Sequence, residues 1–222
     1  TEINLRWNTS SKATSYSLQA SDNGSTGWSD SKSTTIDSTN GTAKVSGLSA
    51  SKAKYFRVFA NNGTTSSVAS AVVCGMTAPK AVRDITATAT SDTTVRLTWS
   101  CDSSATEYVV SVDGRAVKTV KEKSATIEGL KAGTVYTFAV TARNQNGAKY
   151  IEAAKVEKKA ATLLGKVQNV EVSAVSDSKF TISWTAVTNA TSYEIKGDLT
   201  ATVTGTSYTF TGLKAGTTYK IK

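Results

Sequence analysis

Histidine is absent from this chain of 222 residues, and the sequence has only two cysteines, one methionine and one proline. Without histidine the chain lacks the commonest general acid or base at neutral pH and the imidazole ligand of catalytic zinc sites. The cysteines do not stand at metal-ligand spacing, and neither phosphate-binding pattern, GxGxxG or GxxxxGK, occurs. We therefore expect no catalytic residue, no metal site and no cofactor in this segment, although another domain of the same polypeptide could be an enzyme.

Long apolar runs are missing as well. No stretch reaches the roughly 18 apolar residues of a membrane-spanning helix, and no charged-then-apolar leader opens the chain. The net charge of +9 is spread along the chain, and the densest lysine groups are interleaved with Glu122 and Glu157. No aromatic ladder accompanies these lysines. The sequence therefore predicts no membrane span in this segment, no nucleic-acid partner and a solvated basic surface, with an anion-binding face as the alternative.

What the chain does contain is a spaced pattern of tryptophan, tyrosine and Gly-Leu in three copies. In each copy the tryptophan precedes the tyrosine by nine residues. The copies are Trp7/Tyr16/Gly47-Leu48, Trp99/Tyr108/Gly129-Leu130 and Trp184/Tyr193/Gly212-Leu213. Successive tryptophans lie 92 and 85 residues apart, above the roughly 20 to 50 residues of solenoid repeats and near the roughly 100 residues of an immunoglobulin-like sandwich. Each copy therefore indicates one whole domain.

The middle copy shows the period of β-strands most clearly. Apolar and polar residues alternate over 95–99, 108–112 and 136–142, as expected of strands with one buried face. Asp113-Gly114 and Asn146-Gly147 are typical tight-turn pairs. Seven strands are expected, over 81–89, 94–100, 106–112, 115–120, 124–128, 134–143 and 149–156. No helix is needed.

A longer motif is shared by the middle and third copies. The middle copy combines Trp99 and Tyr108 with the run Gly129-Leu130-Lys131-Ala132-Gly133-Thr134-Val135-Tyr136, and the third contains Gly212-Leu213-Lys214-Ala215-Gly216-Thr217-Thr218-Tyr219. With these residues the chain resembles tandem fibronectin type III domains, and the sequence of the motif is similar to that in bacterial secreted or cell-surface proteins. The resemblance covers essentially the whole chain.

This resemblance implies an all-β fold of tandem immunoglobulin-like sandwiches, each with three strands packed on four. The core tryptophans would be Trp7, Trp99 and Trp184. Tyr136 and Tyr219 would form the tyrosine corner, in which the hydroxyl bonds to the backbone of the preceding loop.

The spacing predicts three repeats over residues 1–77, 78–162 and 163–222. The first is expected to lack its first strand and the last to lack its final strand, which would leave open sheet edges. We expect a segment of a longer polypeptide. In the alternative, a neighbouring subunit donates the missing strand and the chains polymerise head to tail.

The first repeat departs from the pattern at the tyrosine corner. Six residues after the leucine of Gly-Leu comes Lys54, and Tyr55 follows one position late. If Phe56 points inward, Tyr55 points outward and the corner is lost. Two interpretations are open. The repeat has drifted and carries a local β-bulge, or Tyr55 and Phe59 form an aromatic contact on the outer face.

The middle of the first repeat is also longer, and the extra segment contains Asp22, Asn23 and Trp28. A calcium loop would need a fuller ligand pattern with a distal glutamate, which is missing. Trp28 is predicted to cover the outer edge of the sheet, and its alternative role is to stack on carbohydrate.

Cys74 and Cys101 flank the start of the second repeat. In a fibronectin type III sandwich the entry linker and the loop after the tryptophan strand lie at the same pole. The resemblance therefore implies a disulfide between these residues that pins the first domain to the second, with two thiols as the alternative. A bridge would point to an oxidising exterior.

Together these features predict a non-enzymatic extracellular spacer and interaction scaffold within a larger surface or secreted protein. One alternative is a self-assembling subunit of an extracellular filament, surface layer or phage virion. The other is an accessory region of a secreted polysaccharide-degrading enzyme. The expected partner is a protein, through self-association or neighbouring domains, or a polysaccharide.

Overall fold

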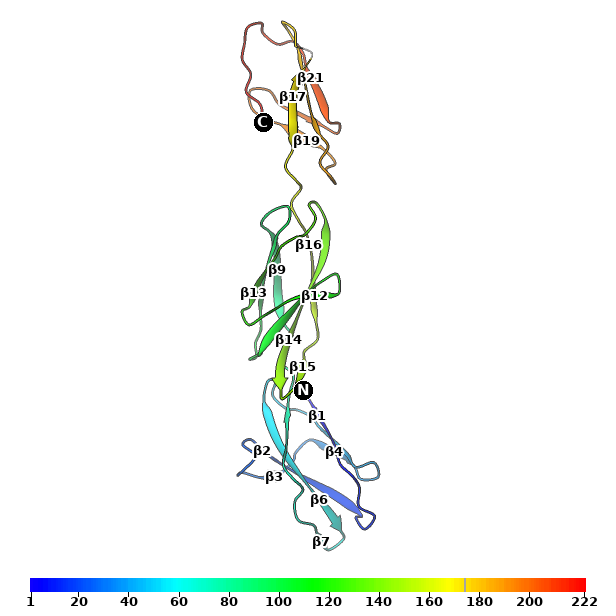
Figure 1. Cartoon of the computed structure of the whole chain (residues 1–222). Coiled ribbons are helices and arrows are strands. Elements are labelled where there is room, and N and C mark those ends of the chain that lie inside the picture. The colour runs from blue at the N-terminus through cyan, green and yellow to red at the C-terminus, as the bar shows by residue number, and fades with distance from the viewer. Residues whose placement is uncertain (174) are drawn as a thin grey trace. The chain divides into compact units, whose positions relative to one another are not determined.

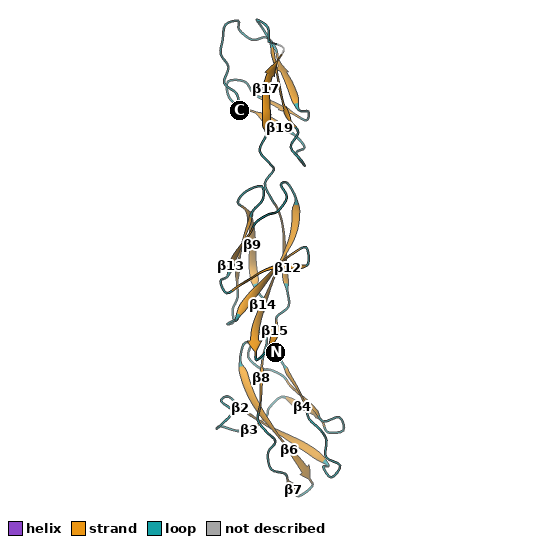
Figure 2. Ribbon diagram, in the orientation of Figure 1, coloured by secondary structure: helices purple, strands orange, loops and turns teal. Residues whose placement is uncertain are grey.

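Every regular element that the structure describes is a β-strand, as Figure 2 shows by its colours. The structure is a computed structural model and describes residues 1–173 and 175–222. Within these residues no helix has the length and apolar character that a membrane crossing requires. The all-β tandem fold expected from the sequence is confirmed.

Backbone contacts divide the chain into two compact units whose boundary runs through the middle repeat. The first unit comprises Thr1–Thr86, Thr98–Ala125 and Phe138–Lys158. The second comprises Ala87–Leu97, Thr126–Thr137 and Lys159–Lys222. The first repeat therefore lies entirely in the first unit, and the third repeat lies entirely in the second.

The first repeat is built from two antiparallel sheets (Figure 1). One has the strand order β1-β5-β4, with β1 Ile3–Arg6, β5 Thr42–Val45 and β4 Thr34–Asp37. The other has the order β3-β2-β6-β7, and β8 also pairs with β6. Its strands are β3 Ser29–Asp30, β2 Ser15–Ser21, β6 Ala53–Asn62, β7 Thr65–Ser66 and β8 Val73–Met76.

The middle repeat has a three-stranded and a five-stranded sheet. The first has the order β13-β10-β9, with β13 Ser124–Ile127, β10 Val95–Ser100 and β9 Arg83–Ala89. The second has the order β12-β11-β14-β15, and β16 also pairs with β14. Its strands are β12 Arg115–Val120, β11 Glu107–Val112, β14 Val135–Asn146, β15 Lys149–Glu152 and β16 Val156–Ala161.

The prediction of one strand over 149–156 is wrong, and so is the expectation that this sheet has four strands, because it has five. The chain forms β15 and β16 instead, with residues 153–155 between them. At this break Ala153 N–H donates to Ala142 O at 2.9 Å, so the chain stays along β14 while the regular pairing is interrupted. The break divides one edge strand into two short ones.

The third repeat has a three-stranded sheet in the order β17-β18-β21 and a two-stranded sheet of β19 and β20. The strands are β17 Gln168–Ser173, β18 Phe180–Thr185, β21 Ser207–Phe210, β19 Tyr193–Ile195 and β20 Ala201–Val203. Its core contains Ile182, Trp184, Ile195 and Phe210.

Alternation places the core side chains on facing sheets. In the first repeat the buried cluster comprises Ile3, Leu18, Ala20, Ala43, Val45 and Phe56, with Trp7 packed against it. In the middle repeat the fully buried positions include Val95, Leu97, Val110, Phe138, Val140 and Ala142. The hairpin that joins β11 to β12 turns at Asp113 and Gly114, which both have positive φ, as a type I′ turn requires.

Candidate contact surface on the first repeat

The repeated tryptophan and tyrosine pack against each other inside each repeat. The ring centroids lie 5.4 Å apart for Trp7 and Tyr16, 5.4 Å for Trp99 and Tyr108, and 5.3 Å for Trp184 and Tyr193. All three tryptophan Nε1 atoms are buried and have no hydrogen-bond acceptor among the described residues. These residues therefore pack in the cores of their repeats.

The hydroxyl groups of these tyrosines differ in their partners. Tyr16 Oη accepts a hydrogen bond from Ser10 N–H at 2.6 Å, and Tyr193 Oη accepts one from Val187 N–H at 2.9 Å. In the middle repeat the neighbour is Cys101. Burial, followed by electrostatic interaction and hydrogen bonding with Cys101, raises the pKa of Tyr108 from 10.0 to about 12.

The structure places both expected corner tyrosines against the preceding loop. Lys131 N–H donates to Tyr136 Oη at 2.8 Å, and Lys214 N–H donates to Tyr219 Oη at 2.9 Å. Lys54, which occupies the equivalent position in the first repeat, forms an ion pair with Asp22 at 2.7 Å.

The β-bulge interpretation of the first repeat is wrong, because β6 pairs regularly on both sides. Its ladder with β2 runs from Ser15↔Asn61 to Ser21↔Tyr55 without a register shift, and its ladder with β8 is also regular. Phe56 is fully buried, so Tyr55 lies on the outer face of the sheet. There the Tyr55 ring lies so close to Gly24 that a Cβ added at Gly24 would be 2.6 Å from the ring.

Trp28, Arg57 and Phe59 form a stack on this outer face. The Arg57 guanidinium carbon lies 4.4 Å from the Trp28 ring centroid and 5.4 Å from the Phe59 ring centroid. Gln19 Oε1 accepts hydrogen bonds from Arg57 Nε at 3.0 Å and Nη2 at 2.7 Å, which fixes the plane of the guanidinium. All three stacked residues are half-buried. We call Trp28, Tyr55, Arg57 and Phe59 the outer aromatic face.

The outer aromatic face combines flat apolar rings with a positively charged hydrogen-bond donor. Such surfaces bind through ring stacking and directed hydrogen bonds. The positions of β14 that correspond to Arg57 and Phe59 are Ala139 and Thr141, so the middle repeat lacks this face. Sequence reasoning had identified the aromatic residues but missed Arg57, although its alternation with Phe56 and Val58 placed it outward.

Two buried threonines at the ends of the first and middle repeats were also missed. Thr77 Oγ1 donates to Ser49 O at 2.7 Å and accepts from Lys52 N–H at 3.0 Å. Thr162 Oγ1 donates to Lys131 O at 2.7 Å and accepts from Thr134 N–H at 3.1 Å. Each threonine thus ties the last strand of its repeat to the loop after Gly-Leu.

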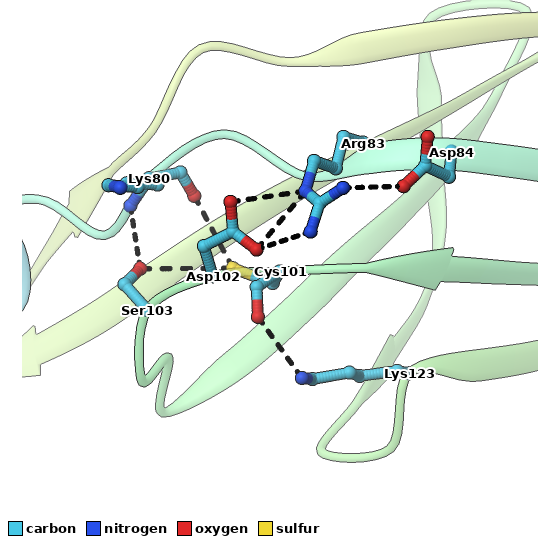
Figure 3. A network of polar contacts seen from close by, with 7 residues as sticks. All are labelled: Lys80, Arg83, Asp84, Cys101, Asp102, Ser103 and Lys123. Atoms are coloured by element: carbon cyan, nitrogen blue, oxygen red, sulfur yellow. Dashed lines mark hydrogen bonds and ion pairs between the residues drawn. The ribbon is translucent and has the colours of Figure 1, made fainter.

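The disulfide expected between Cys74 and Cys101 is absent, and both residues are free thiols. Cys74 is exposed and belongs to β8, where it pairs with Tyr55, and so it does not lie in the linker that the disulfide prediction required. Cys101 is buried. Its Sγ donates to Lys80 O at 3.5 Å, and its carbonyl accepts from Lys123 Nζ at 3.1 Å (Figure 3).

An ion pair lies next to Cys101 in Figure 3. Arg83 Nε and Nη2 both donate to Asp102, with the shortest contact at 2.6 Å, while Arg83 Nη1 lies 3.0 Å from Asp84. The hydrogen bond from Arg83 lowers the pKa of Asp102 below its usual value. These side chains are exposed to solvent, so the pair contributes little to stability. No group of three or more cysteine, aspartate or glutamate side chains gathers around a metal-sized site in the described residues.

A sequence model of the fibronectin type III domain matches residues 79–158 and 165–222, which together make up more than half of the chain. Chitinase A1 of Niallia circulans is 32% identical over 160 residues, covering 64% of this chain and 23% of the relative. Fibronectin type III domain-containing protein 7 of Mus musculus is 30% identical over 162 residues, covering 68% of this chain and 21% of the relative. The chain thus spans less than a quarter of the length of either relative.

Two solved structures of fibronectin type III domains are also similar. The FN1-FN3 domains of chicken CNTN1 share 21% identity, with 100% of this chain and 87% of that chain covered and a TM-score of 0.32. A two-domain segment of chicken tenascin shares 17% identity, with 73% and 93% covered and a TM-score of 0.45. The assignment rests on the sequence match, and by that match the chain belongs to the fibronectin type III domain family.

Proposed function

We propose that this chain is a non-enzymatic spacer and interaction scaffold within a larger secreted or cell-surface protein. Its three repeats, over residues 1–77, 78–162 and 163–222, would hold a functional part of that protein at a set distance. The outer aromatic face of the first repeat would contact the partner. The work of such a module is mechanical and geometric, and it needs no cofactor.

The observation that carries the proposal is the Trp28–Arg57–Phe59 stack. These side chains lie outside the core cluster of the first repeat. The middle repeat forms its sheet with Ala139 and Thr141 at the corresponding positions, so the fold does not require the stack. Half-buried aromatic residues and arginine are enriched at contact surfaces.

Contacts at the ends of the first two repeats support the spacer role. In the first compact unit, the Thr77 hydroxyl donates a hydrogen bond to Ser49 O within the first repeat. The Thr77 carbonyl accepts a hydrogen bond from Asn144 Nδ2 of the middle repeat at 3.4 Å. In the second unit, Leu163 O accepts from Gly133 N–H at 2.8 Å, and Asn189 Nδ2 donates to Gly133 O at 3.0 Å. Short linkers with such hydrogen bonds differ from a flexible Gly/Ser tether.

A polysaccharide is the partner class that we favour. Chitinase A1, to which this chain is similar, is named for a polysaccharide substrate, and this likeness also favours a second candidate function, an accessory region of a polysaccharide-degrading enzyme. A planar ring beside a fixed guanidinium can stack on a sugar ring and donate hydrogen bonds to its hydroxyls. Self-association through the same face is the competing mode of contact.

The test is retention of the chain on suspended insoluble chitin and cellulose, measured as the fraction left in solution. We expect the wild type to be retained on one of them and the Trp28→Ala variant to lose most of that retention. Tyr150→Ala is the matched control, because Tyr150 is an exposed aromatic residue that stacks under Arg143 at 3.8 Å in the middle repeat. Equal retention of the two variants, or none for the wild type, would count against polysaccharide binding by the face. Dimers in analytical ultracentrifugation that Trp28→Ala dissociates would indicate self-association instead.

A further inference from the structure

The first repeat has a cleft beside its Gly-Leu loop where the other two repeats have a tyrosine corner. Six residues after Leu130 and Leu213, the Tyr136 and Tyr219 hydroxyls accept hydrogen bonds from Lys131 N–H and Lys214 N–H. Six residues after Leu48 the residue is Lys54. The loop otherwise has the same form, because Ser51 and Gly133 occupy equivalent positions and both have positive φ, 55° at Ser51 and 58° at Gly133.

The cleft has a volume of about 540 Å³, within the range of roughly 300–1,000 Å³ that is typical of small-ligand sites. It is lined by Asp22, Gly47, Leu48, Ser49, Lys52, Ala53, Lys54 and Thr77. Leu48 and Ala53 supply apolar surface. All eight residues belong to the first repeat.

One backbone donor in the cleft lacks the acceptor that its counterparts have. Ser49 N–H is equivalent to Lys131 N–H and Lys214 N–H, which bond to the corner tyrosines. In the part of the chain that the structure describes, no protein group accepts from Ser49 N–H. The Ser49 carbonyl, in contrast, is held by Thr77 Oγ1. The loop backbone is therefore fixed, while the donor is available.

Three charged residues line the cleft, and two of them form an ion pair, which leaves Lys52 as the remaining charge. Lys54 Nζ lies 2.7 Å from Asp22 Oδ1, so its positive charge is already paired. The Asp22 carboxylate is largely exposed at the rim and would repel an approaching anion. A neutral ring with one hydroxyl avoids this repulsion.

We propose that the cleft binds the side chain of a tyrosine from a protein partner. The phenol oxygen would accept the hydrogen bond from Ser49 N–H, and the ring would pack against Leu48 and Ala53. The partner would thus supply the tyrosine side chain that the middle and third repeats each contain in their own sequence. Lys54 and Tyr55 point to opposite faces of β6, so this site is separate from the outer aromatic face and does not depend on its function.

The test is an NMR titration of the full ¹⁵N-labelled chain with N-acetyltyrosinamide, with N-acetylphenylalaninamide as the matched ligand. We expect saturable shifts of the Leu48, Ser49 and Lys52 amide signals. The phenylalanine compound, which lacks the hydroxyl, should bind roughly 2- to 10-fold more weakly, the effect of one neutral hydrogen bond. No shifts, or equal affinity for both compounds, would overturn the proposal.

A variant provides the second arm of the test. Lys54→Tyr places a tyrosine in the corner position and should fill the cleft, which would abolish the shifts of the Ser49 region. Lys44→Tyr is the control, because Lys44 lies on β5, away from the cleft, and pairs with Glu2. Shifts that persist in Lys54→Tyr would contradict binding in the cleft. The comparison of the two ligands needs only the wild type, so it stands even if a variant fails to fold.

Discussion

At the scale of single residues, Cys101 gives the middle repeat a tyrosine environment that the other repeats lack. Tyr16 and Tyr193 accept hydrogen bonds from the backbone, whereas Tyr108 lies beside a buried thiol. The first cause of its raised pKa is burial, and Cys101 adds to it.

This environment predicts a loss of stability in alkali. Since the folded-state pKa of Tyr108 is raised from 10.0 to about 12, the folded state favours the neutral phenol. Its contribution to stability is full below pH 10 and is lost as the pH rises through about 12. In an NMR titration of the tyrosine rings, Tyr108 should titrate last or nearly so. Cys101→Ala should lower the pKa of Tyr108, while burial keeps that pKa above 10. If Tyr108 instead titrates near pH 10 in the wild type, the ring is solvated and this account is wrong.

The buried hydroxyl of Thr77 is expected to stabilise the first repeat. Thr77→Val keeps the shape of the side chain but leaves Ser49 O and Lys52 N–H without their hydroxyl partner. An unsatisfied buried polar group costs roughly 1–3 kcal/mol, so we expect the first repeat to lose about 2 kcal/mol of unfolding free energy. Urea unfolding followed by the amide signals of this repeat measures the change. Thr77→Ser, which retains the hydroxyl, should lose much less, and equal losses in both variants would rule out the hydrogen bonds as the cause.

At the scale of elements, the loop after β2 covers Tyr55 through Gly24. Gly24 and Gly27 both have positive φ, but only an added Cβ at Gly24 meets the Tyr55 ring, whereas Gly27 has nothing within 4 Å. Alanine at either position should cost roughly 1–2 kcal/mol for the left-handed backbone. Gly24→Ala should cost roughly 1–3 kcal/mol more because it overpacks the ring. Thermal unfolding of the two variants separates these contributions, and equal destabilisation would mean that the loop does not rest on Tyr55.

The elements also show how far the sequence could predict this structure. Alternation and turn pairs located the strands of the middle repeat except the one expected over 149–156, which is divided into two. The outward direction of Tyr55 followed from the inward Phe56. The β-bulge was a wrong explanation, because a lysine can simply replace the corner tyrosine without changing the ladder. The disulfide prediction placed Cys74 in a linker, but β8 extends to Met76.

Arg57 and Thr77 could not be assigned from the pattern alone. The stack of Arg57 depends on where the long loop places Trp28, and no periodicity describes an irregular loop. Thr77 is one of many threonines, and its burial depends on the path of the chain as it leaves the sheet. Both positions are decided by tertiary contacts between segments that are distant in the sequence.

At the scale of the whole molecule, the central claim is that the chain acts as a spacer made of tandem fibronectin type III repeats. The most direct test is small-angle X-ray scattering of the chain in solution. A single compact domain of this length would have a radius of gyration of roughly 17 Å. The spacer proposal predicts a value well above this, unchanged with protein concentration. A radius of gyration close to that of a compact domain would contradict it.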